Sequence, residues 1–201
     1  MDAGAPPWAS LGRVQTELGS RCTGTLIGSR TVLTAAHCLV APRTGRLVQP
    51  SSVHFLLGYR QGAWKATARA AGFRTGPGFD PRTRLPRGAD WAVVTLEAPI
   101  EAQPLPLLEE NPTPSQPLML GGYQQDRPEV LMADTACRVL GTAVLEGLRL
   151  IAHDCAATRG ASGAPLLARG PDGGWAVAGV SVAVALDAAR GVAVPARALR
   201  E

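Results

Sequence analysis

Short apolar or alternating runs recur along the whole chain, and Gly, Pro, Asn and Asp separate them. Because runs of this length that are rich in Val, Leu and Thr are typical of strands, the pattern predicts an all-β protein with many short strands. Helix is expected only in the turn after His37 and in the tail 195–201, whose proline lies where a helix start tolerates it. The predicted strands are 24–27, 31–34, 53–57, 64–70, 91–96, 117–120, 136–140, 144–151, 164–167, 175–183 and 191–194.

Proline is concentrated between the two halves of the chain. Residues 101–117 contain five prolines, and at that density neither an internal strand nor a helix is expected. We therefore predict one domain, 1–201, in which this Pro-rich linker joins an N-terminal half, 8–100, to a C-terminal half, 118–201. Each half has the size of one closed antiparallel barrel, and closure leaves no unpaired edge strand.

Length and cysteine content narrow the class of protein. With 201 residues, 46% of them hydrophobic, the chain can bury a substantial core. No window approaches 18 consecutive apolar residues, so no membrane insertion is expected. The four cysteines lack a CxxC spacing and are typical of two disulfides, which implies a secreted or periplasmic protein whose export signal has been removed. A cytosolic protein with four free thiols is the alternative.

The charge pattern argues against a nucleic-acid partner. The formal net charge is +4, and the arginines are scattered along the chain without forming a block. The exception is Arg82, Arg84 and Arg87, which lie together in a Pro/Gly-rich stretch. Nucleic-acid binding proteins concentrate basic residues on one element or face, so no such partner is predicted.

A serine between small residues is the candidate nucleophile. Ser162 lies in the segment Gly160-Ala161-Ser162-Gly163-Ala164, where small neighbours allow unusual dihedrals and let a substrate backbone approach. The N–H groups of Gly160 and Ser162 are expected to converge on a carbonyl oxygen and stabilise it as it becomes an oxyanion. The alternative is an ordinary Gly/Ala/Ser turn.

The candidate base and its carboxylate lie upstream of this serine. The chain has three histidines, His37, His54 and His153. His37 ends a strand-like run and adjoins Cys38, where a cross-link would hold the backbone still, whereas the other two are more typical of strand residues. A Ser–His pair needs a third group to fix the tautomer. Asp90, at the start of the apolar run 91–96, is the candidate, and Asp80, in a predicted exposed loop, is the alternative.

Four segments, taken in order, resemble the chymotrypsin-like (trypsin-fold) serine peptidases. They are 24–27 (GTLI), 32–38 (VLTAAHC), 90–96 (DWAVVTL) and 160–165 (GASGAP). The order His, Asp, Ser is that of the family, with 53 residues from His37 to Asp90 and 72 from Asp90 to Ser162. The resemblance implies two six-stranded antiparallel β-barrels with the active site in the cleft between them. It also implies peptide-bond hydrolysis by a His37–Asp90–Ser162 triad through an acyl-enzyme.

The same resemblance supplies the disulfides and the partners. It pairs Cys22 with Cys38, as in the histidine-loop disulfide of the family, and leaves Cys137 to pair with Cys155. The expected partner is a peptide or protein substrate, no cofactor or metal is implied, and we expect a monomer.

Two positions depart from the trypsin type. Ala161 stands where chymotrypsin-type members have the aspartate that pairs with a new N-terminus, and Ala156 stands where trypsin-like members have the pocket aspartate. The chain is therefore more similar to the bacterial branch that includes the glutamyl endopeptidases, although 179–183 lacks the histidine of that branch. We predict a neutral primary pocket for small or medium apolar side chains, lined by Ala156, Ala157, Ser181, Val182 and Ala183.

Two other classes of function are compatible with the residues. One is a non-catalytic module on the same fold that binds a peptide or partner, which Ala161 and the small, featureless pocket favour. The other is a zinc site formed by His37, Cys38, His153 and Cys155. Neither His/Cys pair has the spacing that a structural zinc site uses, so we do not predict a metal.

Overall fold

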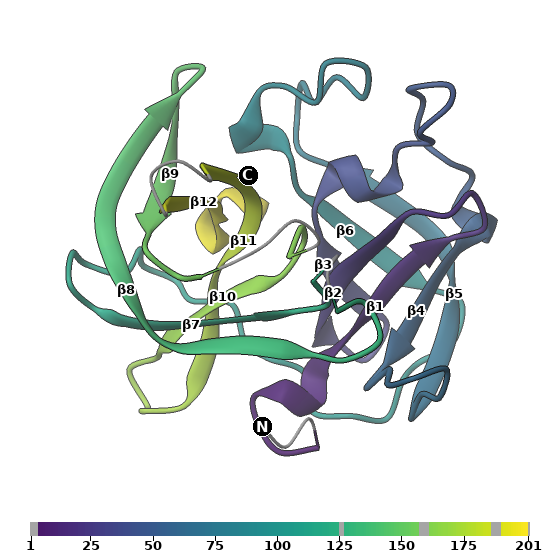
Figure 1. Ribbon diagram of the computed structural model, residues 1–201, viewed down its shortest axis with the longest axis horizontal. Coiled ribbons are helices and arrows are strands. Elements are labelled where there is room, and N and C mark those ends of the chain that lie inside the picture. The colour runs from purple at the N-terminus through teal and green to yellow at the C-terminus, as the bar shows by residue number, and fades with distance from the viewer. Residues whose placement is uncertain (1–3, 125–126, 157–160, 186–189, 201) are drawn as a thin grey trace.

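The computed structural model describes residues 4–124, 127–156, 161–185 and 190–200. The strands close into two barrels of six antiparallel strands each, which lie side by side in Figure 1, the first purple to blue and the second green to yellow. The helices in these ranges are short 3-10 turns, and the tail forms one of them, η5 (Ala196–Arg200). The predicted all-β class and the two six-stranded barrels are confirmed.

The first barrel contains the strands that precede the Pro-rich segment. Around the barrel the order is β1 (Leu11–Thr16), β2 (Arg21–Gly28), β3 (Thr31–Thr34), β6 (Ala92–Leu96), β5 (Ala66–Thr75) and β4 (Val53–Leu57). Three short 3-10 turns, η2 (Ala36–Leu39), η3 (Pro50–Ser52) and η4 (Arg87–Ala89), connect these strands.

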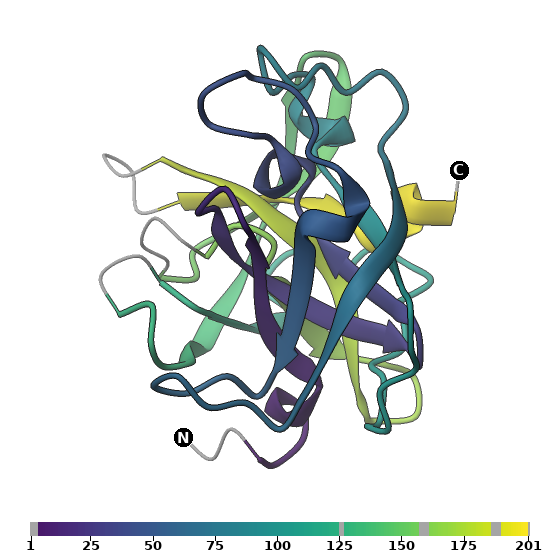
Figure 2. The same ribbon diagram turned by 90° about the vertical axis from the view of Figure 1, so that its right-hand side faces the viewer.

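The second barrel repeats this arrangement with the following strands. Its order is β10 (Pro165–Arg169), β11 (Trp175–Ala185), β12 (Arg190–Pro195), β9 (Leu148–His153), β8 (Met132–Leu145) and β7 (Pro117–Gly122). Figure 2, turned by 90°, shows the first barrel in front of the second. No helix in the described ranges is long and apolar enough to cross a membrane.

A pair of glycines lets one aromatic ring fill the first barrel. Gly12 on β1 lies opposite Gly24 on β2, and the buried Phe55 comes from β4. A Cβ atom on Gly12 would lie 2.6 Å from the Phe55 ring, and one on Gly24 would lie 3.2 Å from it. Any side chain at Gly12 would therefore displace the ring from the core.

The strand predictions are wrong at two places. β1 was not predicted, because Gly12 and Arg13 interrupt the apolar pattern even though Leu11 and Val14 are buried. The predicted strand 144–151 spans a hairpin turn, because Glu146 and Gly147 have φ of 50° and 79°. Positive φ at both central residues is the geometry of a type I′ turn, which joins β8 to β9.

The Pro-rich segment is bonded to both barrels. Leu105 N–H donates to the Leu26 carbonyl of the first barrel at 2.9 Å. Leu108 N–H donates to the Val177 carbonyl of the second at 2.8 Å, and Val177 N–H donates to the Pro106 carbonyl at 2.8 Å. Although proline keeps the segment out of the sheets, these bonds fix its path against β2 and β11.

Candidate active site

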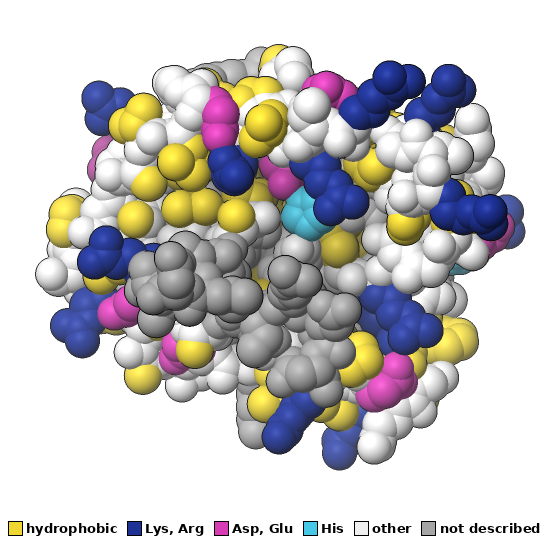
Figure 3. Space-filling model, turned by 45° about the horizontal axis from the view of Figure 1, so that its top comes forward, with side chains coloured by type: hydrophobic (Ala, Val, Ile, Leu, Met, Phe, Trp, Pro, Cys, Tyr) yellow, Lys and Arg dark blue, Asp and Glu magenta, His cyan; other side chains and the backbone are white. Residues whose placement is uncertain are grey.

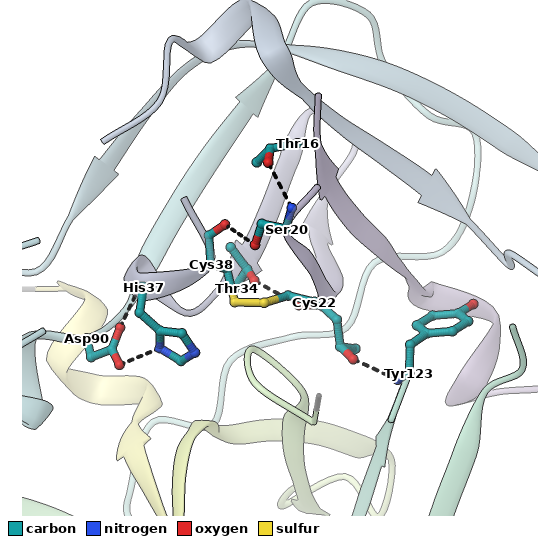
Figure 4. The surroundings of a disulfide bond; sticks show 9 residues. Thr16, Ser20, Cys22, Thr34, His37, Cys38, Asp90 and Tyr123 are labelled. Carbon is teal, nitrogen blue, oxygen red and sulfur yellow. Dashed lines mark hydrogen bonds and ion pairs between the residues drawn. A yellow bond between two sulfur atoms is a disulfide. The ribbon is translucent and has the colours of Figure 1, made fainter. Parts of the chain in front are cut away.

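His37 and Asp90 meet because the strands beside them are neighbours. His37 lies in η2 just after β3, and Asp90 lies just before β6. In the register of these paired strands Thr34 is opposite Ala92, so the residues that follow one and precede the other share an end of the sheet. Asp90 Oδ1 accepts from the backbone N–H of His37 at 2.8 Å, and Asp90 Oδ2 lies 2.7 Å from His37 Nδ1 (Figure 4).

The buried carboxylate determines which ring nitrogen is available. Asp90 is 3% exposed, and the second ring nitrogen of His37 points away from it in Figure 4. Because a carboxylate accepts hydrogen bonds, Nδ1 carries the proton in the neutral ring and Nε2 carries the lone pair. His37 is thereby held in the tautomer that a general base needs.

A disulfide anchors the histidine segment to β2. Cys22 and Cys38 are joined with an S–S distance of 2.06 Å, and Cys137 and Cys155 form the second bridge. These are the two pairings that the family resemblance implies. Ligand atoms of Cys22, His37 and Cys38 all lie within 4.8 Å of one another, but both sulfurs are consumed by the disulfide. Cys38 and Cys155, the two cysteines of the zinc hypothesis, are both in disulfides, so neither is available as a thiolate ligand.

The candidate nucleophile turn, 161–164, is fixed on both sides by backbone hydrogen bonds. Ser162 is half-buried, and its carbonyl accepts from the N–H of Thr23 at 3.0 Å. Gly163 N–H donates to the Ser181 carbonyl of β11 at 2.9 Å. Gly163 has φ of 79°, and a Cβ atom there would lie 2.3 Å from Thr34 Oγ1. Only glycine satisfies both the dihedral and the close approach.

Thr23 connects this turn to the segment that carries His37. Thr23 is fully buried, and its carbonyl accepts from the Thr34 hydroxyl at 2.8 Å, three residues before His37. Its own hydroxyl oxygen accepts from the Tyr123 N–H at 2.8 Å, at the end of β7 (Figure 4). One threonine thus contacts the nucleophile turn, the histidine segment and the second barrel. Sequence reasoning missed it, since nothing in the chain distinguishes Thr23 from Thr25 two residues later.

The predicted pocket residues are only partly within the described ranges. Gly160, proposed for the oxyanion hole, and Ala157, proposed for the pocket, lie outside them. Ser181 and Val182 are buried on β11, and Ser181 N–H donates to the Ala164 carbonyl at 2.8 Å, which brings this strand against the nucleophile turn. The partly buried Ala183 follows on the same strand. Ala156 is exposed, directly after the disulfide residue Cys155.

His153 is a core residue of the second barrel. It is 0% exposed, and a Cβ atom on Gly191 would lie 2.2 Å from its Cε1. Burial lowers the pKa of His153 to about 4, and the charges of Asp154 and Asp134 counteract this only in part. Its Nδ1 accepts from the Cys155 N–H at 3.3 Å, while Nε2 has no partner in the described structure. The ring is therefore neutral near pH 7.

A polar chain on the other side of Thr23 holds the barrels together. The hydroxyl of Tyr123 donates to the Tyr59 carbonyl at 2.9 Å, and the hydroxyl of Tyr59 donates to Glu129. This last bond is the main cause of the lowered pKa of Glu129, and Arg13 adds to it. The Arg13 guanidinium lies 3.5 Å from the centre of the Tyr59 ring. Burial raises the pKa of Tyr123, so its hydroxyl remains a donor.

The β8–β9 hairpin makes a second contact between the barrels, beside Asp90. Glu146 in its turn accepts from the backbone N–H of Arg87 at 3.0 Å and pairs with the Arg87 guanidinium. Leu148 packs on Gly88, where a Cβ atom would lie 2.6 Å from the leucine side chain. Both contacts fall on η4, the turn that leads into Asp90.

Comparison with known proteins identifies the family of the chain. A family model described as a trypsin-like peptidase domain matches residues 22–179, a range that includes His37, Asp90 and Ser162. A search of curated proteins gives no match.

Solved structures share the fold over almost the whole chain. A Glu endopeptidase aligns over 98% of this chain and 89% of its own, with a TM-score of 0.77 and 18% identity. A thermostable serine protease from an extremophilic microorganism aligns over 93% and 91%, with a TM-score of 0.71 and 19% identity. The human heparin binding protein aligns over 95% and 88%, with a TM-score of 0.71 and 17% identity. At such identities the likeness concerns the fold.

Proposed function

The chain belongs to the trypsin-like peptidase domain family, and we propose that it is a serine endopeptidase with Ser162 as nucleophile, His37 as base and Asp90 as orienting carboxylate. The observation that carries the proposal is the double attachment of His37 to the buried Asp90, at the backbone and at Nδ1. A core histidine does not need a buried anionic partner, whereas a general base that must become a cation does.

The reaction follows the general scheme for acyl transfer by a Ser-His-Asp triad. Ser162 Oγ attacks the peptide carbonyl while His37 Nε2 takes its proton, and the imidazolium then gives that proton to the leaving amine. This step leaves an acyl-enzyme, which water attacks with His37 again as base. Asp90 stays ionised throughout and stabilises the imidazolium.

The N–H groups of Gly160 and Ser162 stabilise the oxyanion in this proposal. Loss of one such donor costs about 2.7 to 4 kcal/mol in comparable enzymes. The bonds that Ser162 and Gly163 make to Thr23 and Ser181 support a rigid turn at this point. A preorganised turn needs no rearrangement when charge develops.

The proposed primary pocket is neutral and accepts small or medium apolar side chains. Its proposed lining, Ala156, Ala157, Ser181, Val182 and Ala183, contains no charged residue. Without a buried charge the pocket offers no ion pair to a basic or acidic substrate side chain, so apolar contact decides its preference. The two disulfides support the proposal that the protein acts in an oxidising compartment, either outside the cell or in the periplasm.

A fluorophosphonate probe tests the proposed chemistry, because it reacts with activated serine hydroxyls. We expect wild-type protein to be labelled, Ser162→Ala to be unlabelled, and Ser51→Ala, which changes an exposed serine, to be labelled like wild type. Absence of labelling in folded, disulfide-intact wild type, together with peptide binding that Ser162→Ala leaves unchanged, would establish the binding-module alternative instead.

Cleavage of a random peptide mixture tests the pocket. Sites should cluster after small or medium apolar residues. A majority of sites after Arg, Lys, Asp or Glu would refute the neutral pocket and leave the proposed triad intact.

A further inference from the structure

Positive charge is concentrated in one part of this chain. The 52 residues between His37 and Asp90 contain nine Lys/Arg and a single acid, Asp80, whereas all other residues together contain eleven Lys/Arg and fifteen acids. The segment that connects the proposed base to its carboxylate is therefore strongly basic, and the rest of the protein is net acidic. Segregation of this kind produces a local field that the overall charge of +4 does not reveal.

Two similar loops within this segment touch each other. Residues 42–47 read PRTGRL and residues 81–85 read PRTRL. Each loop is closed by a bridge, Val40 to Leu47 in the first and Asp80 to Leu85 in the second. A Cβ atom on Gly45 would lie 3.7 Å from the Arg82 side chain, which is ordinary van der Waals contact. The loops therefore form one continuous surface.

The four arginines of these loops, Arg43, Arg46, Arg82 and Arg84, are exposed and form no ion pair in the described structure. The one acid between His37 and Asp90 in the sequence, Asp80, is already engaged. Asp80 accepts from the Arg82 N–H at 2.9 Å and from the Thr83 hydroxyl at 3.1 Å, bonds that lower the pKa of Asp80. We call these four residues the arginine rim.

The arginine rim borders the proposed active site from two directions. The first loop follows η2, which contains His37, and the second precedes η4 and Asp90. Figure 3 shows Lys and Arg side chains beside a histidine and elsewhere on the same face, with acidic side chains among them. Arg43 lies six residues after His37 and Arg84 six residues before Asp90, so a substrate segment that passes this side of the His37–Asp90 pair would meet the rim.

We infer that the arginine rim binds carboxylates of an acidic stretch in the polypeptide substrate, next to the bond that is cleaved. This inference rests on the proposed peptidase function. Guanidinium groups bind carboxylates through paired hydrogen bonds, and a local positive field accelerates the encounter with an acidic chain. A short acidic peptide fits better than a long polyanion, because the fifteen acids elsewhere on the chain repel an extended negative polymer.

The test uses two peptides with the same cleavable core and a flank of four Glu or four Gln, placed on either side of the core in turn. We expect the Glu peptide on at least one side to have a kcat/KM higher by about tenfold at low salt, and the ratio to approach one at high salt. Arg82→Glu with Arg84→Glu, and Arg43→Glu with Arg46→Glu, should each abolish the preference.

The matched control changes the net charge of the protein by the same amount at another place. Arg69→Glu with Arg197→Glu alters two exposed arginines outside both loops and should preserve the preference. Equal kcat/KM values for the Glu and Gln peptides in wild type would overturn the inference. So would a control variant that loses the preference for the Glu peptide as fully as the rim variants do. Tighter binding of a sulfated polysaccharide than of the Glu peptide at the same salt would reassign the rim to that class of polyanion.

Binding to Ser162→Ala separates this inference from the proposed function. Fluorescence anisotropy of labelled Glu and Gln peptides reports the rim without any catalysis. Salt-dependent preference of Ser162→Ala for the Glu peptide, together with a wild type that never cleaves, would support the rim and refute the peptidase. Cleavage by wild type without any binding preference in Ser162→Ala would do the reverse.

Discussion

At the scale of single residues, the carboxylate of Asp90 has two tasks. It orients the His37 ring through Nδ1 and fixes the His37 backbone through the N–H group. The amide of Asn is nearly isosteric but can donate, so it accommodates the wrong tautomer of the ring.

Asp90→Asn should therefore lower kcat by about four orders of magnitude, because the ring loses its correct tautomer, while the protein remains folded. Steady-state cleavage of the best peptide from the mixture measures this. Asp80, the alternative aspartate, caps an exposed turn. Asp80→Asn should keep kcat within about twofold of the wild-type value on the same peptide, chosen without charged residues. A larger loss from Asp80→Asn than from Asp90→Asn would reverse the assignment.

Two threonines on β2 form a natural comparison. Thr23 and Thr25 are both fully buried, but Thr23 uses its hydroxyl to accept from Tyr123, whereas the Thr25 hydroxyl has no partner in the described structure. Thr23→Val should lower the free energy of unfolding by about 1 to 3 kcal/mol because it leaves a buried N–H unpaired. It should also slow acylation by about tenfold, because a shift of Thr23 away from Tyr123 moves the Thr23 backbone N–H that holds the Ser162 carbonyl.

Thr23→Ser retains the hydroxyl that accepts from Tyr123, so it should acylate at close to the wild-type rate and faster than Thr23→Val. A purely space-filling role of Thr23 would not allow this result. Thr25→Val removes a hydroxyl that already lacks a partner and should be neutral or stabilising, with unchanged acylation. Denaturant titration and single-turnover kinetics measure both properties. Equal effects of Thr23→Val and Thr25→Val would show that the hydrogen bond between the Thr23 hydroxyl and Tyr123 does not matter.

His153 makes the free energy of unfolding depend on pH in the acid range. Its pKa is about 4 in the folded protein and about 6.5 in the unfolded chain, so the unfolded state binds more protons between these values. Stability contributed by the neutral ring is complete above about pH 6.5 and is lost as the pH falls toward 4, by about 3 kcal/mol in total.

His153→Leu should flatten this part of the stability profile, measured as the urea midpoint between pH 4 and 7, because no buried ring remains to be protonated. The same series on His54→Asn, which changes a surface histidine paired with Glu17, should retain the wild-type slope. An unchanged slope in His153→Leu would show that other groups cause the acid sensitivity.

At the scale of elements, the turn after Ser162 combines a left-handed glycine with close packing. Gly163 and Gly173 have nearly equal φ of 79° and 77°, but a Cβ atom on Gly173 would meet nothing within 4 Å. Gly173→Ala should therefore cost about 1 to 2 kcal/mol from backbone strain alone. Gly163→Ala adds a clash with Thr34 and should cost at least about twice as much and abolish probe labelling.

Thermal unfolding of both variants separates strain from packing. The account requires Gly173→Ala to keep full labelling. Similar stability losses in the two variants, with labelling intact in both, would mean that the turn can move away from Thr34 without consequence.

Sequence patterns predict elements well where the alternation is uninterrupted. β3 and β4 have the bounds that their runs indicate. β4 lies between Ser52 and Gly58, and β3 begins after Arg30. β1 was missed because its register places Gly12 beneath the Phe55 ring, a requirement of the distant β4. The Glu146-Gly147 turn was missed because glutamate at positive φ is not a usual turn signal.

The residues of the candidate site also differ in how clearly the local sequence indicates them. His37, Asp90 and Ser162 were predicted from motif blocks that are local in sequence. Thr23 could not be, because its importance comes from partners that are distant in the chain, Ser162 and Tyr123. Long-range contacts of this kind leave no periodic signal in a single sequence.

At the scale of the whole molecule, the proposed triad draws on both barrels. Asp90 and His37 belong to the first barrel and Ser162 to the second, and the Thr23 and Arg87 contacts fix the barrels on either side of them. The arginine rim belongs wholly to the first barrel. In the proposed mechanism the first barrel supplies the base and binds the acidic substrate segment, and the second supplies the nucleophile and the primary pocket.

The most direct test of the central claim is to trap the acyl-enzyme. Wild-type protein is mixed with p-nitrophenyl acetate, quenched in acid, digested and mapped by mass spectrometry. The account predicts one acetyl group, on the peptide that contains Ser162, with no adduct there in Ser162→Ala and much slower formation in His37→Ala. Folded, disulfide-intact protein that gains no acetyl group, or gains it at another residue, would contradict it.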